Sequence, residues 1–442
     1  MTIFNGERLE TELFQLDRER MAAGWYSDVY FRNIAGILEE LSKEGYEFKG
    51  QNIGDIEVEL QIFPRRQPFC IAGGIDEALS ILKTATGYED EAGNFVNTSS
   101  ELEVEACHDG EKIFYNGNPH NVEPVIKIRG RYRDFSILET PILGSLTEAS
   151  RIATNVYKVM VAARGKDILF FPARFTHYKL QAMHGYAYSL GVNAYNNEYD
   201  TNTGRFISTD EQGAWWGGKG GGTISHSYVA SFLGDTAEAM LQFCRLMPLN
   251  VNRIALVDFD NDCVATTLKV LKTMFNKYIS LLKAGEKEEA QRYRLFGVRP
   301  DNSSDLRDES VQPLGKKELD NGVNARLIFN LRKAIDNAYK SWDLQPGDIS
   351  RAKKFCRDVK IIATGGFTPQ KIDRFESSQV PVDIYGVGSW LLSNCGAEDT
   401  KNDYTADVVR VKVDGKWKEM AKVGRSPASN PNLEKVDLSE IE

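Results

Sequence analysis

The sequence predicts an α/β protein whose main part is a (β/α) barrel, and two observations lead to this prediction. The chain has 442 residues, which is more than one hydrophobic core usually serves, so about two or three domains are expected. Beyond residue 136, short uninterrupted apolar runs end at a polar or glycine residue and are followed by a helical pattern. Such strands, separated by helices, are typical of a parallel sheet covered on both faces.

Five apolar runs support the barrel prediction, and each is followed by residues that are able to do chemistry. They are residues 168–171 before 172–174, 254–257 before 258–260, 295–298 before 299–301, 359–363 before 364–366, and 382–385 before 386–388. In a (β/α) barrel the active site lies at the C-terminal ends of the strands. We therefore expect the segments that follow these runs to converge in space.

The two ends of the chain have a different pattern. The first 135 residues alternate helix-like segments, such as 34–42 and 75–84, with short extended runs, which predicts a small α/β domain. After Tyr404 the chain returns to extended runs and a polar end, and we expect this tail to pack on the N-terminal domain. The expected domains are 1–135, 136–399 for the barrel, and 400–442 for the C-terminal segment.

The composition excludes several classes of protein. Hydrophobic residues make up 42% and charged residues 26% of the chain, which excludes a disordered or collagen-like protein. A formal net charge of −9 argues against a surface that binds nucleic acid or an anionic membrane. No apolar run reaches the roughly 18 residues that span a bilayer, and the start lacks the pattern of a signal peptide. The six scattered cysteines predict reduced, buried thiols, so we expect a cytoplasmic protein.

Two glycine groups after the last two predicted strands are candidates for phosphate binding. They are Thr364, Gly365 and Gly366 after one strand, and Gly386, Gly388 and Ser389 after the next. Glycine lets backbone amides approach an anion, and the loops after the last strands of a barrel are the usual phosphate position. Each group alone is equally compatible with a tight turn between strand and helix.

Arg299 and Asp301 place a guanidinium and a carboxylate at the end of one predicted strand. The guanidinium suits a carboxylate or phosphate, and the carboxylate suits ribose hydroxyls or magnesium. An exposed turn with a helix cap is the alternative, at about even odds.

His226 lies where the glycine-rich segment 217–222 runs into a predicted helix, next to the hydroxyl residues Ser225 and Ser227. Unpaired amides at a helix start would help an imidazole that contacts phosphate. A histidine that only begins the helix explains the local sequence equally well.

Aromatic side chains and an arginine could hold a planar anionic ring. Phe171 and Arg174 end one strand, and Tyr30 lies near the start of the chain. Rings of this kind stack on a planar ligand, and arginine pairs with a carboxylate. Any one of these aromatics is more often part of a core.

In combination and in order, these segments resemble the nicotinate phosphoribosyltransferase family, a branch of the type II phosphoribosyltransferases. The resemblance extends from about residue 25 to 425 and rests on residues 27–30, 139–143, 171–174, 222–227, 257–260, 297–301, 364–366 and 386–389. It implies an irregular (β/α) barrel, an N-terminal α/β domain completed by the C-terminal segment, and a homodimer with shared active sites.

The resemblance also implies a reaction in NAD salvage. Nicotinate would displace pyrophosphate from phosphoribosyl pyrophosphate to give nicotinate mononucleotide, with Mg2+ as cofactor and ATP as co-substrate acting through a phosphohistidine. Carried over residue by residue, Tyr30 of the partner and Phe171 stack on the ring, and Arg174 and Arg299 hold anionic groups. Asp301 holds ribose or magnesium, and His226 is the phosphorylated histidine. The two glycine groups bind phosphate, and Thr223, Ser225 and Asp258 are further substrate contacts.

The chain departs from the family pattern at three places, so two alternatives stay open. Residues 171–175 lack the usual second basic residue, residues 301–305 replace Asp-Ser-Gly-Asp, and the segment that normally precedes the histidine motif is not legible. One alternative is a nicotinamide phosphoribosyltransferase, because residues 298–301 also resemble that branch. The other is a non-catalytic nucleotide-binding homologue.

Overall fold

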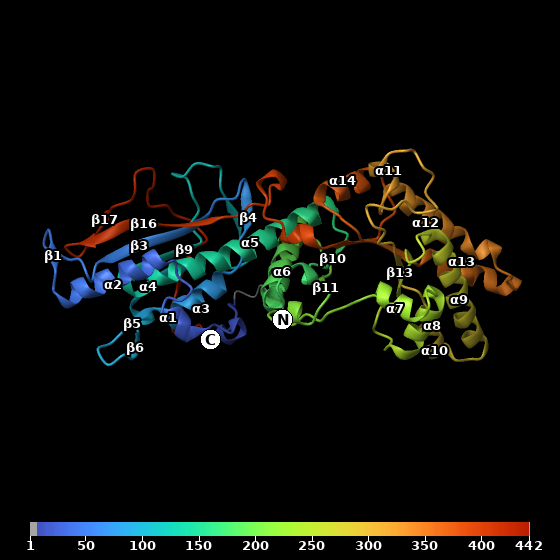
Figure 1. The fold of residues 1–442 in the computed structure, drawn as a ribbon, viewed down its shortest axis with the longest axis horizontal. Coiled ribbons are helices and arrows are strands. Elements are labelled where there is room, and N and C mark those ends of the chain that lie inside the picture. Colours follow the sequence, from blue (N-terminus) through green and yellow to red (C-terminus); the bar gives the residue numbers. More distant parts are fainter. Residues whose placement is uncertain (1–6, 442) are drawn as a thin grey trace.

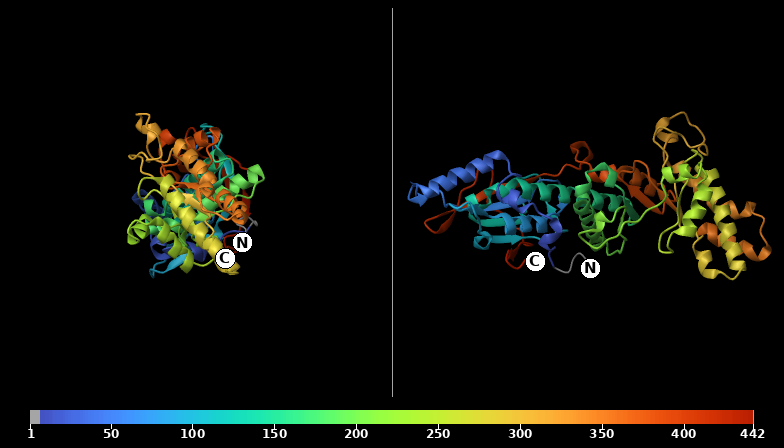
Figure 2. Two further views of the ribbon diagram at one scale, coloured as in Figure 1. Left: turned by 90° about the vertical axis from the view of Figure 1, so that its right-hand side faces the viewer. Right: turned by 60° about the horizontal axis from the view of Figure 1, so that its bottom comes forward.

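A computed structural model describes residues 7–441. The first six residues of the predicted N-terminal domain and residue 442 of the predicted C-terminal segment lie outside the described part. The molecule is elongated, with an antiparallel sheet at one end and a parallel sheet covered by helices toward the other (Figure 1; Figure 2). The mixed α/β class predicted from the sequence is confirmed.

The parallel sheet has six strands in the order β11-β10-β15-β14-β13-β12. Each predicted apolar run overlaps one strand, and β11 was not predicted. The strands are β10 (Asp167–Phe170), β11 (Phe206–Ile207), β12 (Ile254–Leu256), β13 (Gly297–Arg299), β14 (Lys360–Ala363) and β15 (Ile384–Val387). Within the described residues β11 and β12 form the two edges, so the sheet is a half-barrel rather than a closed one.

Helices cover the parallel sheet because the segments between its strands carry apolar faces. Those on the sheet and beyond it are α5 (Glu139–Ala162), α6 (Gln181–Tyr199), α7 (His226–Ser231), α8 (Thr236–Leu246), α9 (Cys263–Lys283), α10 (Lys287–Gln291), α11 (Lys317–Asp320), α12 (Ala325–Asn337), α13 (Ile349–Arg357) and α14 (Pro369–Ser377). Apart from α11, these helices contribute buried side chains to one hydrophobic cluster that also contains strand residues such as Phe170 and Val298. α5 runs from the antiparallel sheet to the parallel one and packs along α6 (Figure 1).

The antiparallel sheet combines strands from both ends of the chain, in the order β17-β16-β3-β9-β7-β18. They are β3 (Glu57–Pro64), β7 (Glu103–Ala106), β9 (Ile126–Arg131), β16 (Tyr404–Val413), β17 (Lys416–Glu419) and β18 (Glu434–Val436). β16 pairs with β3 from Tyr404 opposite Pro64 to Val411 opposite Val58. The C-terminal segment therefore completes the N-terminal domain, as the fold prediction states. The exact domain boundaries stay a prediction, since α5 contacts both sheets.

Short elements complete the N-terminal domain. The helices are α1 (Arg18–Ala22), α2 (Val29–Lys43), α3 (Ile75–Ala85) and α4 (Tyr132–Phe135), and the small strand pairs are β1 (Glu47–Phe48) with β2 (Gln51–Asn52), β4 (Phe69–Ile71) with β8 (Lys112–Phe114), and β5 (Gly87–Glu89) with β6 (Phe95–Asn97). α3 contributes buried side chains such as Leu79 and Leu82 to the core beneath the antiparallel sheet.

The prediction of buried thiols needs one correction. Five of the cysteines are buried, and all six are free, but Cys395 is exposed. It lies in the polar connection between the last parallel strand and β16, where little apolar structure covers the chain. Among residues 7–441, no helix is both long enough and apolar enough to cross a membrane.

A buried carboxyl group, Asp109, joins the N-terminal domain to the barrel helix α6. Asp109 accepts hydrogen bonds from the backbone N–H of Ile75 at 2.8 Å and from the hydroxyl of Tyr186 at 3.2 Å. The neighbouring Asp76 pairs with Arg8 at 2.8 Å. Burial, together with the charge of Asp76, raises the pKa of Asp109 to about 8.

This raised pKa predicts how stability changes with pH. Between about pH 5 and pH 8 the folded state keeps a proton on Asp109 that the unfolded state has released, so stability falls as pH rises. The Asp109→Asn variant lacks this proton equilibrium. We measure the free energy of unfolding of both proteins by urea denaturation. As pH rises through this window, the value of the variant minus that of the wild type should increase by roughly 1 kcal/mol per pH unit. Exposed Asp200→Asn is the control, and parallel pH profiles for wild type and Asp109→Asn would contradict the prediction.

Candidate active site

The C-terminal ends of β13 and β14 are joined by a compact set of polar contacts. The hydroxyl of Thr364, directly after β14, donates to Asp301 Oδ1 at 2.6 Å, and Arg299 Nη1 lies 3.1 Å from Asp301 Oδ2. Thr364 also donates its backbone N–H to the carbonyl of Pro300 at 3.3 Å. Both carboxylate oxygens of Asp301 are thus held by residues at strand ends. The expected convergence of these segments is observed here.

Arg299 also reaches the glycine-rich segment that precedes α7. Its Nη2 donates to the carbonyl of Ile224 at 3.3 Å. Ile224 is flanked by Thr223, whose hydroxyl donates to that same carbonyl, and by Ser225, whose hydroxyl accepts the backbone N–H of Tyr228 as the N-cap of α7. The segment that carries the predicted contacts Thr223 and Ser225 is therefore anchored to the strand end.

His226 and Asp258 form a second polar pair at the same edge. His226 Nε2 lies 3.0 Å from Asp258 Oδ2. The imidazole is half exposed, whereas the carboxylate is only 8% exposed. Burial raises the pKa of Asp258 against the opposing effect of His226, and the nearby charge of Asp301 raises it further. The structure thus places two carboxylates close together, with an imidazole open to solvent beside them.

The loop after β14 presents a row of free backbone amides. Gly365 and Gly366 have φ of 96° and 65°, a conformation that favours glycine. The N–H groups of residues 365–368 donate to no group in the described chain. Successive unpaired amides in such a turn form a concave site for an anion.

β15 and the residues that follow it lie beside the loop after β14, and Gly386, predicted to follow the strand, is the third residue of β15. A Cβ on Gly386 would lie 2.5 Å from Thr364 Cγ2 and 3.2 Å from the ring of Phe171, so only glycine fits between them. The amides of Gly388 and Ser389 also find no acceptor among residues 7–441. The predicted phosphate residues therefore form one adjacent group with the predicted ring contact Phe171.

Arg174 lies in the loop after β10, and it does not contact Arg299, Asp301 or Thr364. Its guanidinium is exposed and stacks over the ring of Phe175, 5.2 Å from the centroid. It forms no ion pair with any described carboxylate. Because Phe175 packs near Gly388, Arg174 stands at the rim of the site with its charge available to a ligand.

Tyr30 lies on a different part of the molecule from the other predicted site residues. It lies in α2, on the N-terminal domain, where its ring contacts Phe31 at 4.3 Å between centroids. Burial and the charges of Asp28 and Glu139 raise its pKa. α2 and β13 lie in different halves of the molecule (Figure 1). Within one chain, Tyr30 does not reach the strand-end cluster.

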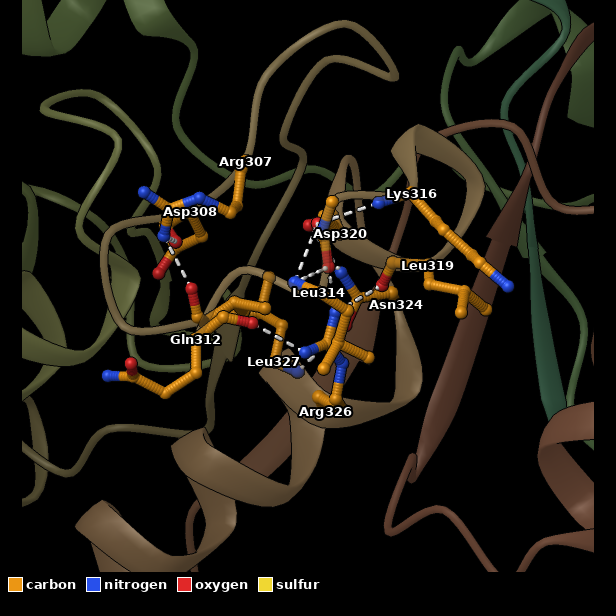
Figure 3. A network of polar contacts seen from close by, with 12 residues as sticks. Arg307, Asp308, Gln312, Leu314, Lys316, Leu319, Asp320, Asn324, Arg326 and Leu327 are labelled. Atoms are coloured by element: carbon orange, nitrogen blue, oxygen red, sulfur yellow. Dashed lines mark hydrogen bonds and ion pairs between the residues drawn. The ribbon is translucent and has the colours of Figure 1, made fainter.

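A polar network holds the long loop that follows Asp301. Asp320 accepts the backbone N–H groups of Leu314, Gly315 and Lys316 at 2.8 to 3.2 Å, and Arg326 pairs with the same carboxylate (Figure 3). Closer to the site, buried Asp308 accepts the side-chain amide of Asn302 at 3.2 Å. This hydrogen bond holds Asn302, the residue that follows Asp301, in place.

Two features of the site were not predicted from the sequence. One is Lys371, in the first turn of α14, whose Nζ donates to the carbonyl of Gly365 at 3.1 Å. The other is a mainly apolar pocket of about 430 Å³ beside the segment 223–225, with Phe243, Leu246 and Met247 from α8 and the residue that follows it. Lys371 lies six residues after Gly365 in the sequence. This spacing predicts a contact between them only when a helix is known to begin between the two residues.

The carboxylates of the site are compatible with a magnesium ion but do not form a complete cage. No group of three or more His, Cys, Asp or Glu side chains in the described chain could hold a metal ion by itself. Asp258 Oδ1 is buried without a hydrogen-bond partner in the described residues, and Asp301 lies nearby. Magnesium is commonly bound by one or two carboxylates together with substrate phosphates and water, and these two residues fit that arrangement.

The Thr364 to Asp301 hydrogen bond can be tested by substitution. Thr364→Val keeps the shape of this buried side chain but removes the hydroxyl, which leaves Asp301 Oδ1 without its donor. We expect a loss of about 1 to 2 kcal/mol in the free energy of unfolding, measured by urea denaturation. Thr364→Ser keeps the hydroxyl and is the matched control. An equal loss in both variants would contradict the prediction, because Thr364→Ser keeps the hydroxyl.

Comparisons with known proteins agree with this architecture. Residues 28–150 match the family model of the quinolinate phosphoribosyl transferase N-terminal domain. Among solved structures, nicotinate-nucleotide pyrophosphorylase from Pyrococcus furiosus is similar with a TM-score of 0.62 and 23% sequence identity, over 93% of this chain and 80% of that chain. Human nicotinic acid phosphoribosyltransferase is similar with a TM-score of 0.54 and 16% identity, over 89% of this chain and 75% of that chain.

At these identities the solved structures show a shared fold, and the family match shows a similarity that is confined to residues 28–150. The two solved structures align over both the antiparallel and the parallel part of this chain, since they cover 93% and 89% of it. The chain therefore shares the fold of these two solved structures, and residues 28–150 are similar to the quinolinate phosphoribosyl transferase N-terminal domain.

Proposed function

We propose that this protein is a nicotinate phosphoribosyltransferase, which forms nicotinate mononucleotide and pyrophosphate from nicotinate and phosphoribosyl pyrophosphate. The observation that supports this most is the strand-end cluster of Arg299, Asp301 and Thr364 beside two loops of unpaired amides. A substrate with phosphate groups on both sides of a ribose needs this combination of anion sites around a carboxylate. The fold shared with two enzymes, one named for nicotinate nucleotide and the other for nicotinic acid, supports the same class.

In the proposed reaction the pyridine nitrogen attacks C1 of the ribose as the bond to pyrophosphate breaks. Positive charge develops on the sugar and negative charge on the leaving group, so catalysis needs positioning and electrostatic stabilisation rather than a nucleophilic side chain. Asp301 and Asp258 carry negative charge close to where the ribose would lie. The amides of residues 365–368 and of Gly388 and Ser389 bind the phosphate, and Arg299 stabilises anionic charge.

Mg2+ and ATP complete the proposal. Magnesium would be held by Asp301, with Asp258 beside it, and would neutralise charge on the pyrophosphate. His226 is the proposed phosphorylated histidine, because its imidazole is half exposed and Asp258 holds Nε2. Its other ring nitrogen is then the one free to accept a phosphoryl group from ATP. Turnover with and without ATP tests this part separately.

The ring carboxylate of nicotinate is assigned to Arg174. Arg299 already contacts Asp301, Thr364 and Ile224, whereas Arg174 is exposed at the rim. A charge-assisted pair with a carboxylate is stronger than a hydrogen bond to a neutral amide. Nicotinate is therefore the proposed base, and nicotinamide is the weaker substrate.

Quinolinate is a second candidate base, because the matched family model carries its name. Its additional carboxylate would need a further cation beside Arg174, and the residue that follows Arg174 is Phe175. A non-catalytic homologue is disfavoured by the retention of Arg299, Asp301 and His226 at one strand edge.

The proposed activity is tested by product formation from a panel of bases. Purified protein is incubated with Mg2+, phosphoribosyl pyrophosphate and nicotinate, nicotinamide or quinolinate, with and without ATP, and the mononucleotide is identified. We expect the highest kcat/KM with nicotinate. Arg174→Met should lower that value by about ten- to a hundredfold while leaving nicotinamide turnover nearly unchanged. Exposed Arg357→Met is the control, and equal or better kcat/KM with nicotinamide would refute the assignment.

We propose a homodimer in which Tyr30 contributes to the active site of the partner, and complementation tests this proposal. Tyr30 lies in a different half of the chain from the strand-end cluster (Figure 1), so it reaches a ligand there only across a two-fold interface. Inactive Tyr30→Ala and inactive Arg299→Ala proteins are mixed under conditions of subunit exchange. Heterodimers should contain one site with both native residues and regain about half the native activity. No recovery despite demonstrated exchange would show that Tyr30 does not contribute to the partner's site.

A further inference from the structure

Lys371 is a largely buried cation directly behind the loop that follows β14. It is the third residue of α14, and its Nζ donates to the carbonyl of Gly365 at 3.1 Å. The ammonium lies over the ring of Phe367, 4.2 Å from its centroid, and 5.9 Å from that of Phe375. The side chain is therefore held between the loop and two aromatic rings.

The charge of Lys371 is not balanced by the protein. Within residues 7–441 no carboxylate forms an ion pair with it, and the nearby charge that affects it is the cation Arg374. A lysine in the first turn also opposes the helix dipole, which favours anions at that end. Burial, with a smaller effect of Arg374, lowers the pKa of Lys371 to about 8. Neither helix stability nor ion pairing explains a cation at this position.

The hydrogen bond to Gly365 fixes the direction of the next amide. The peptide between Gly365 and Gly366 is trans, so its carbonyl and its N–H point in opposite directions. Because Lys371 holds the carbonyl on the side of α14, the N–H of Gly366 must point away from α14. That N–H is one of the unpaired amides of the loop.

We propose that Lys371 is a positioning residue of the phosphate subsite, which orients the Gly366 amide toward the bound anion and supplies the positive charge behind it. This inference rests on the proposed function, since it assigns a role within the same loop. The proposed ligand at residues 365–368 is a doubly charged tetrahedral oxyanion. Arrival of the anion stabilises the protonated ammonium, so binding takes up protons near pH 8.

The other charged and titratable groups around Lys371 do not replace this role. Asp301 lies beyond Gly365 and is held by Arg299 and Thr364. On the side of Phe367, Glu376 pairs with Lys166 and accepts the hydroxyl of Tyr385. Arg374, on the same helix, is exposed.

The test measures binding of inorganic sulfate to the full chain by calorimetry from pH 6.5 to 9. The charge of sulfate is constant over this range, so any pH dependence belongs to the protein. Lys371→Met should raise the Kd by roughly tenfold, and Lys371→Arg should retain most of the affinity. In the wild type, affinity should fall as pH rises through 8, and comparison of two buffers should show proton uptake at pH 8. Lys371→Arg should show neither effect. Lys360→Met is the matched control, because that lysine also lies over an aromatic ring but at the opposite end of β14.

The outcomes separate this inference from the proposed function. Unchanged sulfate affinity in Lys371→Met, or wild-type binding without proton uptake, overturns the inference. If Lys371→Met does not fold, the inference is still tested by comparing the number of protons taken up on sulfate binding by the wild type and by Lys371→Arg. A wild-type protein that binds no sulfate overturns the phosphate subsite and the inference together. Sulfate binding that depends on Lys371 in a protein that forms no mononucleotide overturns the proposed function alone.

Discussion

The hydrogen bond from the Thr364 hydroxyl to Asp301 is the contact on which the rest of the site depends. This hydrogen bond is 2.6 Å long and joins the ends of the neighbouring strands β13 and β14. With one carboxylate oxygen held by Thr364, the other is directed at Arg299, and Arg299 in turn reaches the carbonyl of Ile224. One buried hydroxyl thereby sets the positions of a carboxylate, a guanidinium and the segment that leads to His226.

The same edge concentrates charge of both signs in a partly buried place. Burial raises the pKa of Asp258, and the nearby charge of Asp301 raises it further. The unpaired amides of the two glycine loops provide the opposite polarity within the same group of strand ends. A ligand that carries positive charge in its centre and negative charge at its ends is complementary to this distribution.

The sequence predicted the strands and their convergence because parallel strands buried on both faces leave a clear apolar signature. It also predicted that Arg299, Asp301 and Thr364 would lie together, since each follows such a run. It did not predict β11, which has only two residues, or the open edge of the sheet, because both depend on packing between distant elements. Lys371 was missed for the same reason: its contact with Gly365 exists only once a helix begins in between. The role of Tyr30 stays a prediction, because a single chain does not bring it to the strand ends.

The pairing of β16 with β3 has a consequence for how the chain is made. β3 leaves the ribosome early, but its partner β16 lies beyond the whole parallel sheet in the sequence. Until the last part of the chain is synthesised, the nascent N-terminal sheet ends at an unpaired edge on β3, and such edges promote association between chains. The half-barrel is complete before this edge is closed. Translation that stops short of Tyr404 would therefore leave a folded barrel attached to an incomplete, aggregation-prone domain.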